Sequence, residues 1–176
     1  SSIQFAIHYM FENPTILHNF LTNIAECTQI GGYFIGTSYN GKKIFELLKD
    51  KKQGESLVIM DRDNSNKLLE ITKVYDRDEF LDNISCLGYG IDVFQESINK
   101  TFREYLVNYD YLIQLLENYG FIQLTSDELS SINFPRSVGD FSDLFDLMNN
   151  EIKREPIKRN DYGTAYKMTA EQRRIS

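Results

Sequence analysis

Hydrophobic and polar positions change period several times along the chain, and the first changes predict a strand followed by a helix. The apolar run at residues 2–7 predicts a buried strand. Residues 14–27 then carry apolar side chains at helical spacing, with Asn13 as a suitable N-cap and Pro14 at the first helical position. The apolar positions of this predicted helix are Ile16, Leu17, Phe20, Leu21 and Ile24.

The same order repeats in the next segment. Residues 33–38 predict a short buried strand in which Gly36 permits close backbone approach, and residues 40–50 predict a short helix. A strand–helix–strand–helix order is typical of an open α/β sheet, where binding residues gather at the carboxyl ends of the strands. His8 and Tyr9 follow the first predicted strand, and Thr37 and Ser38 end the second.

The middle of the chain has the pattern of an antiparallel sheet. Two predicted strands, residues 55–61 and 67–76, flank the polar turn at residues 62–66. Residues 88–98 and 103–110 predict two further strands. We therefore expect an antiparallel β insertion in the α/β domain.

The last third is predicted to be mainly helical. Residues 109–121 form a helical pattern with Leu112, Leu115 and Leu116 on one face and Gly120 as its stop. Residues 121–125 predict a strand that returns to the main sheet. Helices are expected at residues 127–132 and 139–153, the second with Phe141, Leu144, Phe145 and Met148 on one face, and residues 168–176 begin like another helix.

Composition narrows the class of protein. The 176 residues are 41% hydrophobic and 26% charged, as in one globular domain, and no apolar stretch is long enough to predict a transmembrane helix. A net charge of −7 disfavours gripping long stretches of nucleic-acid backbone, but it permits recognition of a single nucleotide. Cys27 and Cys86 lack metal-site spacing and are expected to be reduced and buried.

Five segments together resemble the messenger-RNA cap guanine-N7 methyltransferases, and the resemblance covers nearly the whole chain. They are "SIQFAIHYMFE", "GGYFIGTSYNGKKI", "GYGIDVFQESI", "EYLVNYDYLIQLLENYGF" and "MTAEQRRIS". The Asn-, Ile-, Lys- and Tyr-rich composition is similar to that of large DNA virus capping enzymes. The resemblance implies a Rossmann-like class I fold that uses S-adenosylmethionine as methyl donor and needs no metal.

The resemblance also implies that residues 1–176 are the carboxyl-terminal part of a single methyltransferase domain. The amino-terminal cofactor-binding section and the final aromatic strand of the family have no counterpart in the sequence. Neither Gly31–Gly32 nor Gly88–Gly90 follows a strand and opens a helix, as a cofactor-binding turn would. We therefore expect residues 1–176 alone to bind S-adenosylmethionine poorly and to be inactive.

Guanine N7 carries a lone pair and no proton, so the implied reaction is an in-line displacement that needs no general base, and we assign no catalytic residue. By the family match, Phe5, His8, Tyr9 and Glu104 bind the cap guanine, and Gln4 and Tyr9 touch S-adenosylmethionine. Stacked rings stabilise the guanine as it becomes cationic. The Glu104 carboxylate accepts from the N1 and N2 donors of guanine, which adenine lacks.

Each site residue also has a purely structural interpretation. Phe5 alternates with Gln4 in an apolar run and could be core, His8 could be a hydrogen-bonded structural histidine, and Glu104 could be an exposed acid on an edge strand. At the level of function, the alternative is a catalytically inactive, methyltransferase-like regulatory subunit of a capping complex.

The expected partners are 5′-capped RNA and, in a multifunctional enzyme, other capping domains or a stimulatory subunit; no membrane is expected. The expected location is intracellular: the host cytoplasm or the virion for a viral protein, and the nucleus for a cellular one.

Overall fold

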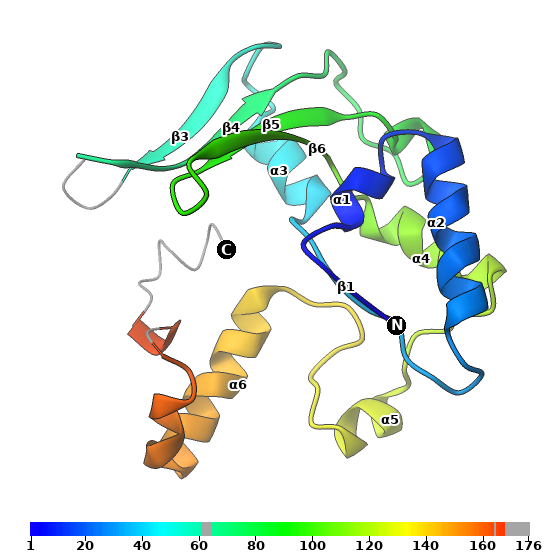
Figure 1. The fold of residues 1–176 in the computed structure, drawn as a ribbon, viewed down its shortest axis with the longest axis vertical. Helices are drawn as coiled ribbons and strands as arrows, with labels where there is room; N and C mark the ends of the chain where they lie inside the picture. Colours follow the sequence, from blue (N-terminus) through cyan, green and yellow to red (C-terminus); the bar gives the residue numbers. More distant parts are fainter. Residues whose placement is uncertain (61–64, 164, 168–176) are drawn as a thin grey trace. The chain divides into compact units, whose positions relative to one another are not determined.

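The computed structural model describes residues 1–60, 65–163 and 165–167 of a mixed α/β chain. The chain divides into two compact units, residues 1–122 and residues 123–176. Figure 1 shows the order of the elements along the chain.

A parallel pair of short strands opens the first unit. Strands β1 (Ser2–Gln4) and β2 (Ile35–Thr37) pair in parallel, with Ile3 opposite Gly36. Helices α1 (Ile7–Met10) and α2 (Pro14–Cys27) connect them. A Cβ atom on Gly36 would lie 2.4 Å from Cδ1 of Ile7, so glycine lets α1 pack closely over the strand pair.

The predicted antiparallel strands form a four-stranded sheet in the order β3–β4–β5–β6. Their bounds are Ser56–Met60, Lys67–Lys73, Gly90–Gln95 and Lys100–Tyr105. One face of the sheet carries buried side chains, among them Leu69, Ile71, Ile91 and Val93. Helix α3 (Gly41–Leu47) ends beside this sheet, where the buried Lys73 ammonium donates to the carbonyl of Lys51 at 2.9 Å.

Helices α1, α2 and α4 (Tyr109–Asn118) enclose the main core of the first unit, and the 3₁₀ turn η1 (Ile84–Cys86) adds one buried thiol. Burying these apolar side chains is the main favourable term in the folding of the unit. The buried members of the core are Ile7, Phe11, Leu17, Phe20, Leu21, Ile24, Cys86, Leu87, Val107 and Leu112.

Asparagine caps begin three of these helices. The side chains of Asn13, Asn40 and Asn108 accept hydrogen bonds from the backbone N–H groups of Ile16, Lys43 and Tyr111 at 3.0, 3.2 and 3.1 Å. Each cap satisfies a donor that the first helical turn leaves without a partner. The predicted cap at Asn13 is confirmed.

The second unit is helical in its described residues. It holds α5 (Ser126–Ser131), α6 (Phe141–Arg154) and the 3₁₀ turns η2 (Pro156–Asn160) and η3 (Ala165–Lys167). Met148 and Ile152 are the buried side chains of α6. Lys158 Nζ donates to the Glu151 carboxylate at 2.5 Å and ties η2 back to α6. No helix in the described part of the chain has the length and apolar content needed to cross a bilayer.

The prediction of one buried strand over residues 2–7 is wrong. The strand ends at Gln4, the backbone turns at Phe5, and residues 7–10 form α1. A helical turn forms because it brings Ile7 and Phe11, four residues apart, to within about 6 Å of each other, so that both enter the same core. In a strand these two side chains would lie about 13 Å apart. His8 and Tyr9 therefore lie on a helix just after the strand.

Three smaller predictions are also wrong. Residues 121–125 form no strand, and Phe121 packs instead against the core of the first unit. Residue Ile35 is more than half exposed, so β2 is not buried. Cys86 is buried as expected, but Cys27, in the last turn of α2, is exposed. The helix predicted to begin in residues 168–176 lies outside the described residues.

Candidate functional site

The candidate site begins where β1 and β2 end side by side. The backbone N–H of Phe5 donates to both the carbonyl and Oγ1 of Thr37, each at 3.0 Å. Thr37 Oγ1 in turn donates to Oε1 of Gln4 at 2.8 Å. These bonds fix the point at which the chain leaves the strand.

Phe5 has an unusual backbone conformation at this point. Its φ of 49° lies in the left-handed region, which costs a residue with a side chain about 1–2 kcal/mol. Phe5 is 56% exposed, so the interpretation of Phe5 as a core residue is wrong. Strain of this kind is retained where the surrounding structure enforces it, often at binding sites.

The sharp turn carries His8 into the interior, beside Glu104. Helix α1 lies against β6 (Figure 1), and the His8 Nε2 atom is 3.7 Å from Oε2 of Glu104. Both residues are buried, at 5% and 7% exposed. Glu104 is therefore not the exposed acid that its sequence position alone would suggest.

Neither residue is satisfied by the surrounding protein. Within the described residues, both ring nitrogens of His8 and Oε2 of Glu104 have no hydrogen-bond partner. Burial lowers the pKa of His8 to about 4 and raises the pKa of Glu104 to about 7. Burial therefore favours the uncharged form of both the imidazole and the carboxyl group. Buried polar atoms without partners are rare and indicate a place for a ligand or water.

Two tyrosines flank the carboxyl group. The Tyr9 ring meets the His8 ring edge-on with centroids 4.2 Å apart, and it is partly exposed. Tyr39 follows β2 and accepts a hydrogen bond from Gln95 Nε2 at 2.7 Å. Burial raises the pKa of both phenols, and the negative charge of Glu104 raises each of them further.

The structure thus brings His8, Tyr9 and Glu104 together. Gln4 and Phe5 lie at the carboxyl end of β1, where the hydrogen bonds described above go to Thr37. Tyr39 and Gln95 were not predicted. The position of Tyr39 just beyond the end of β2 was a usable signal, whereas nothing in the sequence pairs it with a residue on β5.

A close backbone contact at Gly41 fixes the chain just after Tyr39. The backbone N–H of Gly41 donates to the carbonyl of Val107 at 3.0 Å. A Cβ atom at residue 41 would lie 2.3 Å from that carbonyl oxygen, so only glycine allows the contact. This contact holds the start of α3 against the chain that leaves β6.

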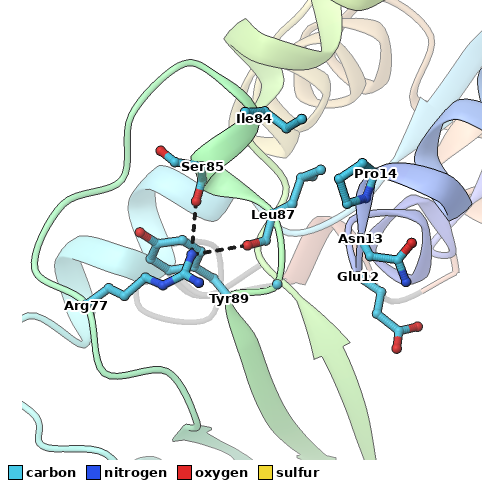
Figure 2. A pocket seen from close by; sticks show the side chains of 9 residues that line it. Glu12, Asn13, Pro14, Arg77, Ile84, Ser85, Leu87 and Tyr89 are labelled. Atoms are coloured by element: carbon cyan, nitrogen blue, oxygen red, sulfur yellow. Dashed lines mark hydrogen bonds between the residues drawn. The ribbon is translucent and has the colours of Figure 1, made fainter.

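An open depression of about 520 Å³ occupies a different part of the first unit (Figure 2). Its lining residues are Glu12, Asn13, Pro14, Arg77, Ile84, Ser85, Leu87, Gly88 and Tyr89. The Arg77 guanidinium lies over the Tyr89 ring and donates to the carbonyls of Ser85 and Leu87. None of the predicted site residues lines it. No cluster of three or more possible metal ligands occurs among the described residues.

Comparison with known proteins gives one family and several relatives. The sequence model of the mRNA (guanine-N(7))-methyltransferase domain matches residues 1–170. A probable mRNA-capping enzyme of Acanthamoeba polyphaga mimivirus is 30% identical over 164 residues, which is 91% of this chain and 12% of that protein.

Two further relatives match over shorter stretches of the chain. The mRNA-capping enzyme catalytic subunit of Fowlpox virus is 32% identical over 129 residues, 73% of this chain and 13% of the relative. The mRNA cap guanine-N(7) methyltransferase of Debaryomyces hansenii is 27% identical over 124 residues, 69% of this chain and 22% of the relative. The chain therefore spans less than a quarter of the length of these relatives.

Proposed function

Because the chain belongs to the mRNA (guanine-N(7))-methyltransferase domain family, we propose that the full-length protein methylates N7 of the 5′ guanosine cap of RNA. The observation that carries the proposal is the unsatisfied pair formed by His8, just beyond the end of β1, and Glu104 on β6. Buried polar atoms without partners are what a guanine edge, rich in donors and acceptors, would satisfy.

Glu104 is proposed to read the guanine. Its carboxylate would accept from N1–H and N2–H, and those donors favour the ionised form of a group whose pKa burial has raised to about 7. Adenine presents no such donor pair. As the ring becomes cationic during methyl transfer, the same hydrogen bonds strengthen, which is the differential stabilisation that catalysis requires.

The rings are proposed to hold the base in place. Phe5 and Tyr9 expose aromatic surface on either side of the buried His8 in the sequence, and stacking contributes about 1–3 kcal/mol per base. His8, uncharged at neutral pH, can donate one hydrogen bond without repelling the developing positive charge. N7 has no proton to lose, so positioning replaces proton transfer.

S-adenosylmethionine supplies the electrophilic methyl group. The chain offers it Gln4 and Tyr9 at the carboxyl end of β1, and the Tyr9 ring is partly exposed. The Gln4 amide bonds Ser2 through Nε2 and Thr37 through Oε1, which leaves a second N–H donor and a second lone pair for this role. No metal enters the proposed reaction.

We infer that β1 and β2 belong to a Rossmann-like class I sheet, into which β3–β6 are inserted to cover the cap, and that residues 1–176 form the carboxyl-terminal part of that one domain. The parallel pairing of β1 with β2 and the antiparallel order of β3–β6 support this arrangement. The family's cofactor-binding section and final strand would come from outside residues 1–176.

Capped RNA is the proposed partner, with other capping domains or a stimulatory subunit in addition. For a viral protein we propose a place in the host cytoplasm or the virion, and for a cellular protein a place in the nucleus.

The test is methyl transfer from labelled S-adenosylmethionine to capped RNA by the full-length protein. Glu104→Gln should lower kcat/KM about 10- to 100-fold, since it removes a charge-assisted hydrogen bond. Glu70→Gln is the matched control, because Glu70 lies on the opposite face of the same sheet in an ion pair with Lys67. Full activity of Glu104→Gln, or no activity in the parent, would contradict the proposal; the second result favours the regulatory subunit.

A further inference from the structure

Strand β6 presents three chemically different side chains on one face. Glu104, Phe102 and Lys100 are spaced two residues apart, so they point the same way, about 7 Å from one to the next. Their opposite residues on β5 are Ile91, Val93 and Gln95, and directly opposite residues share a face. The strip defined by Glu104, Phe102 and Lys100 therefore runs from the candidate guanine site towards the β5–β6 hairpin.

Phe102 is more exposed than its apolar neighbours on this face. Its cross-strand partner Val93 is 1% exposed, and Leu69 on the next strand is also buried, yet Phe102 is 40% exposed. The outer face of the hairpin has no such anomaly: there the Arg103 guanidinium bonds both carboxylate oxygens of Asp92. A large ring left half uncovered on the apolar side of a sheet is a surface suited to stacking.

Lys100 adds a positive charge at the end of the strip. Lys100 is exposed, and no carboxylate among the residues that the structure describes lies within ion-pair distance of it. The residue opposite it, Gln95, already donates to Tyr39. A lysine of this kind can bind a phosphate group, for which it acts as a point charge.

We propose that Phe102 and Lys100 bind the first transcribed nucleotide of the capped RNA, with its base stacked on Phe102 and its 3′ phosphate beside Lys100. The proposal rests on the proposed function, since it takes the cap guanine to be held at Glu104. The order along the strand then matches the order of the substrate: carboxylate for the guanine, ring for the next base and ammonium for the phosphate that follows.

Equilibrium binding by the full-length protein tests this without relying on turnover. Three ligands are compared: GTP, which has no second base; the dinucleotide GpppA, which has the base but no 3′ phosphate; and a short capped RNA, which has both. Phe102→Ala should weaken the binding of GpppA and of capped RNA about 5- to 20-fold and leave the binding of GTP unchanged. Lys100→Ala should weaken the binding of capped RNA alone, and this loss of affinity should be smaller at high salt.

Phe94→Ala is the matched control, because Phe94 lies on the outer face of the same hairpin under the Lys67 ammonium. It should leave all three affinities unchanged. If Phe102→Ala weakens GTP as much as GpppA, or lowers the melting temperature with no selective effect on the ligands, another part of the protein covers the ring and the proposal is overturned. If the protein binds these ligands selectively but transfers no methyl group, the result supports nucleotide binding by the strip and contradicts the proposed methyltransferase activity.

Discussion

His8 Nε2 and Glu104 Oε2 lie 3.7 Å apart, but the two groups do not behave as an ion pair. An ion pair raises the pKa of histidine and lowers that of glutamate. Here burial does the reverse, taking the pKa of His8 down to about 4 and that of Glu104 up to about 7. The site is therefore unfavourable for charge until a ligand supplies hydrogen bonds.

Glu104→Gln should stabilise the protein at alkaline pH. The folded pKa of Glu104 is higher than the unfolded value, so its ionisation costs stability progressively from about pH 4.5 to pH 7. Above pH 7 the cost reaches on the order of 3 kcal/mol. Urea unfolding of the full-length protein should show a variant as stable as the parent at pH 4 and more stable at pH 8. Equal stability of the two proteins at pH 4 and at pH 8 would contradict the raised pKa of Glu104.

Cap affinity should rise with pH up to about pH 7. If the bound guanine requires the ionised carboxylate, each pH unit below the pKa of Glu104 weakens GpppA binding about tenfold, and above it the affinity levels off. His8 stays uncharged throughout this range. Titrations between pH 5.5 and 8.5 at constant salt measure the slope. Glu104→Gln should give a flat profile, and a flat profile in the parent would remove Glu104 from the site.

Gly41→Ala should unfold or loosen the region around the site. The added methyl group would lie 2.3 Å from the Val107 carbonyl oxygen, and a backbone atom cannot yield as a side chain can. We expect a loss of about 1–3 kcal/mol in the free energy of unfolding, as for other overpacked positions. Glu46→Ala, at an exposed position of the same helix, is the control and should change stability little. Denaturant titration distinguishes the two variants.

Lys73→Met should destabilise the end of α3. The Lys73 ammonium donates to the carbonyls of Leu48 and Lys51 and lies over the Tyr75 ring, so it satisfies acceptors that the helix end leaves open. Methionine keeps most of the volume but donates nothing, and a loss of about 1–3 kcal/mol is expected. Hydrogen exchange should increase in residues 44–51. Unchanged exchange there would show that water replaces the ammonium without cost.

Strong periodicity made much of the fold predictable. Helices α2, α4 and α6 were recognised because their apolar residues repeat at helical spacing, and the antiparallel strands because turns separate them. Residues 2–7 misled because a short apolar run fits a strand or a buried helix equally well. Tertiary packing decided between the two, because Ile7 and Phe11 enter the same core only when the chain between them is helical.

The site was only partly predictable. His8, Tyr9 and Glu104 came from the resemblance to a family, and the structure shows that they meet. The burial of Glu104 could not be predicted, since its neighbours Arg103 and Tyr105 give it the pattern of an edge strand. Tyr39 and Gln95 are 56 positions apart, and only the folded sheet brings them into contact.

Because burial raises the pKa of Glu104, recognition of a ligand through its carboxylate becomes a proton-releasing event. Near pH 7, binding of a cap guanine at Glu104 would release protons from those molecules in which the carboxyl is still protonated. The heat of binding would then depend on the ionisation enthalpy of the buffer, and calorimetry in two buffers would count the protons directly.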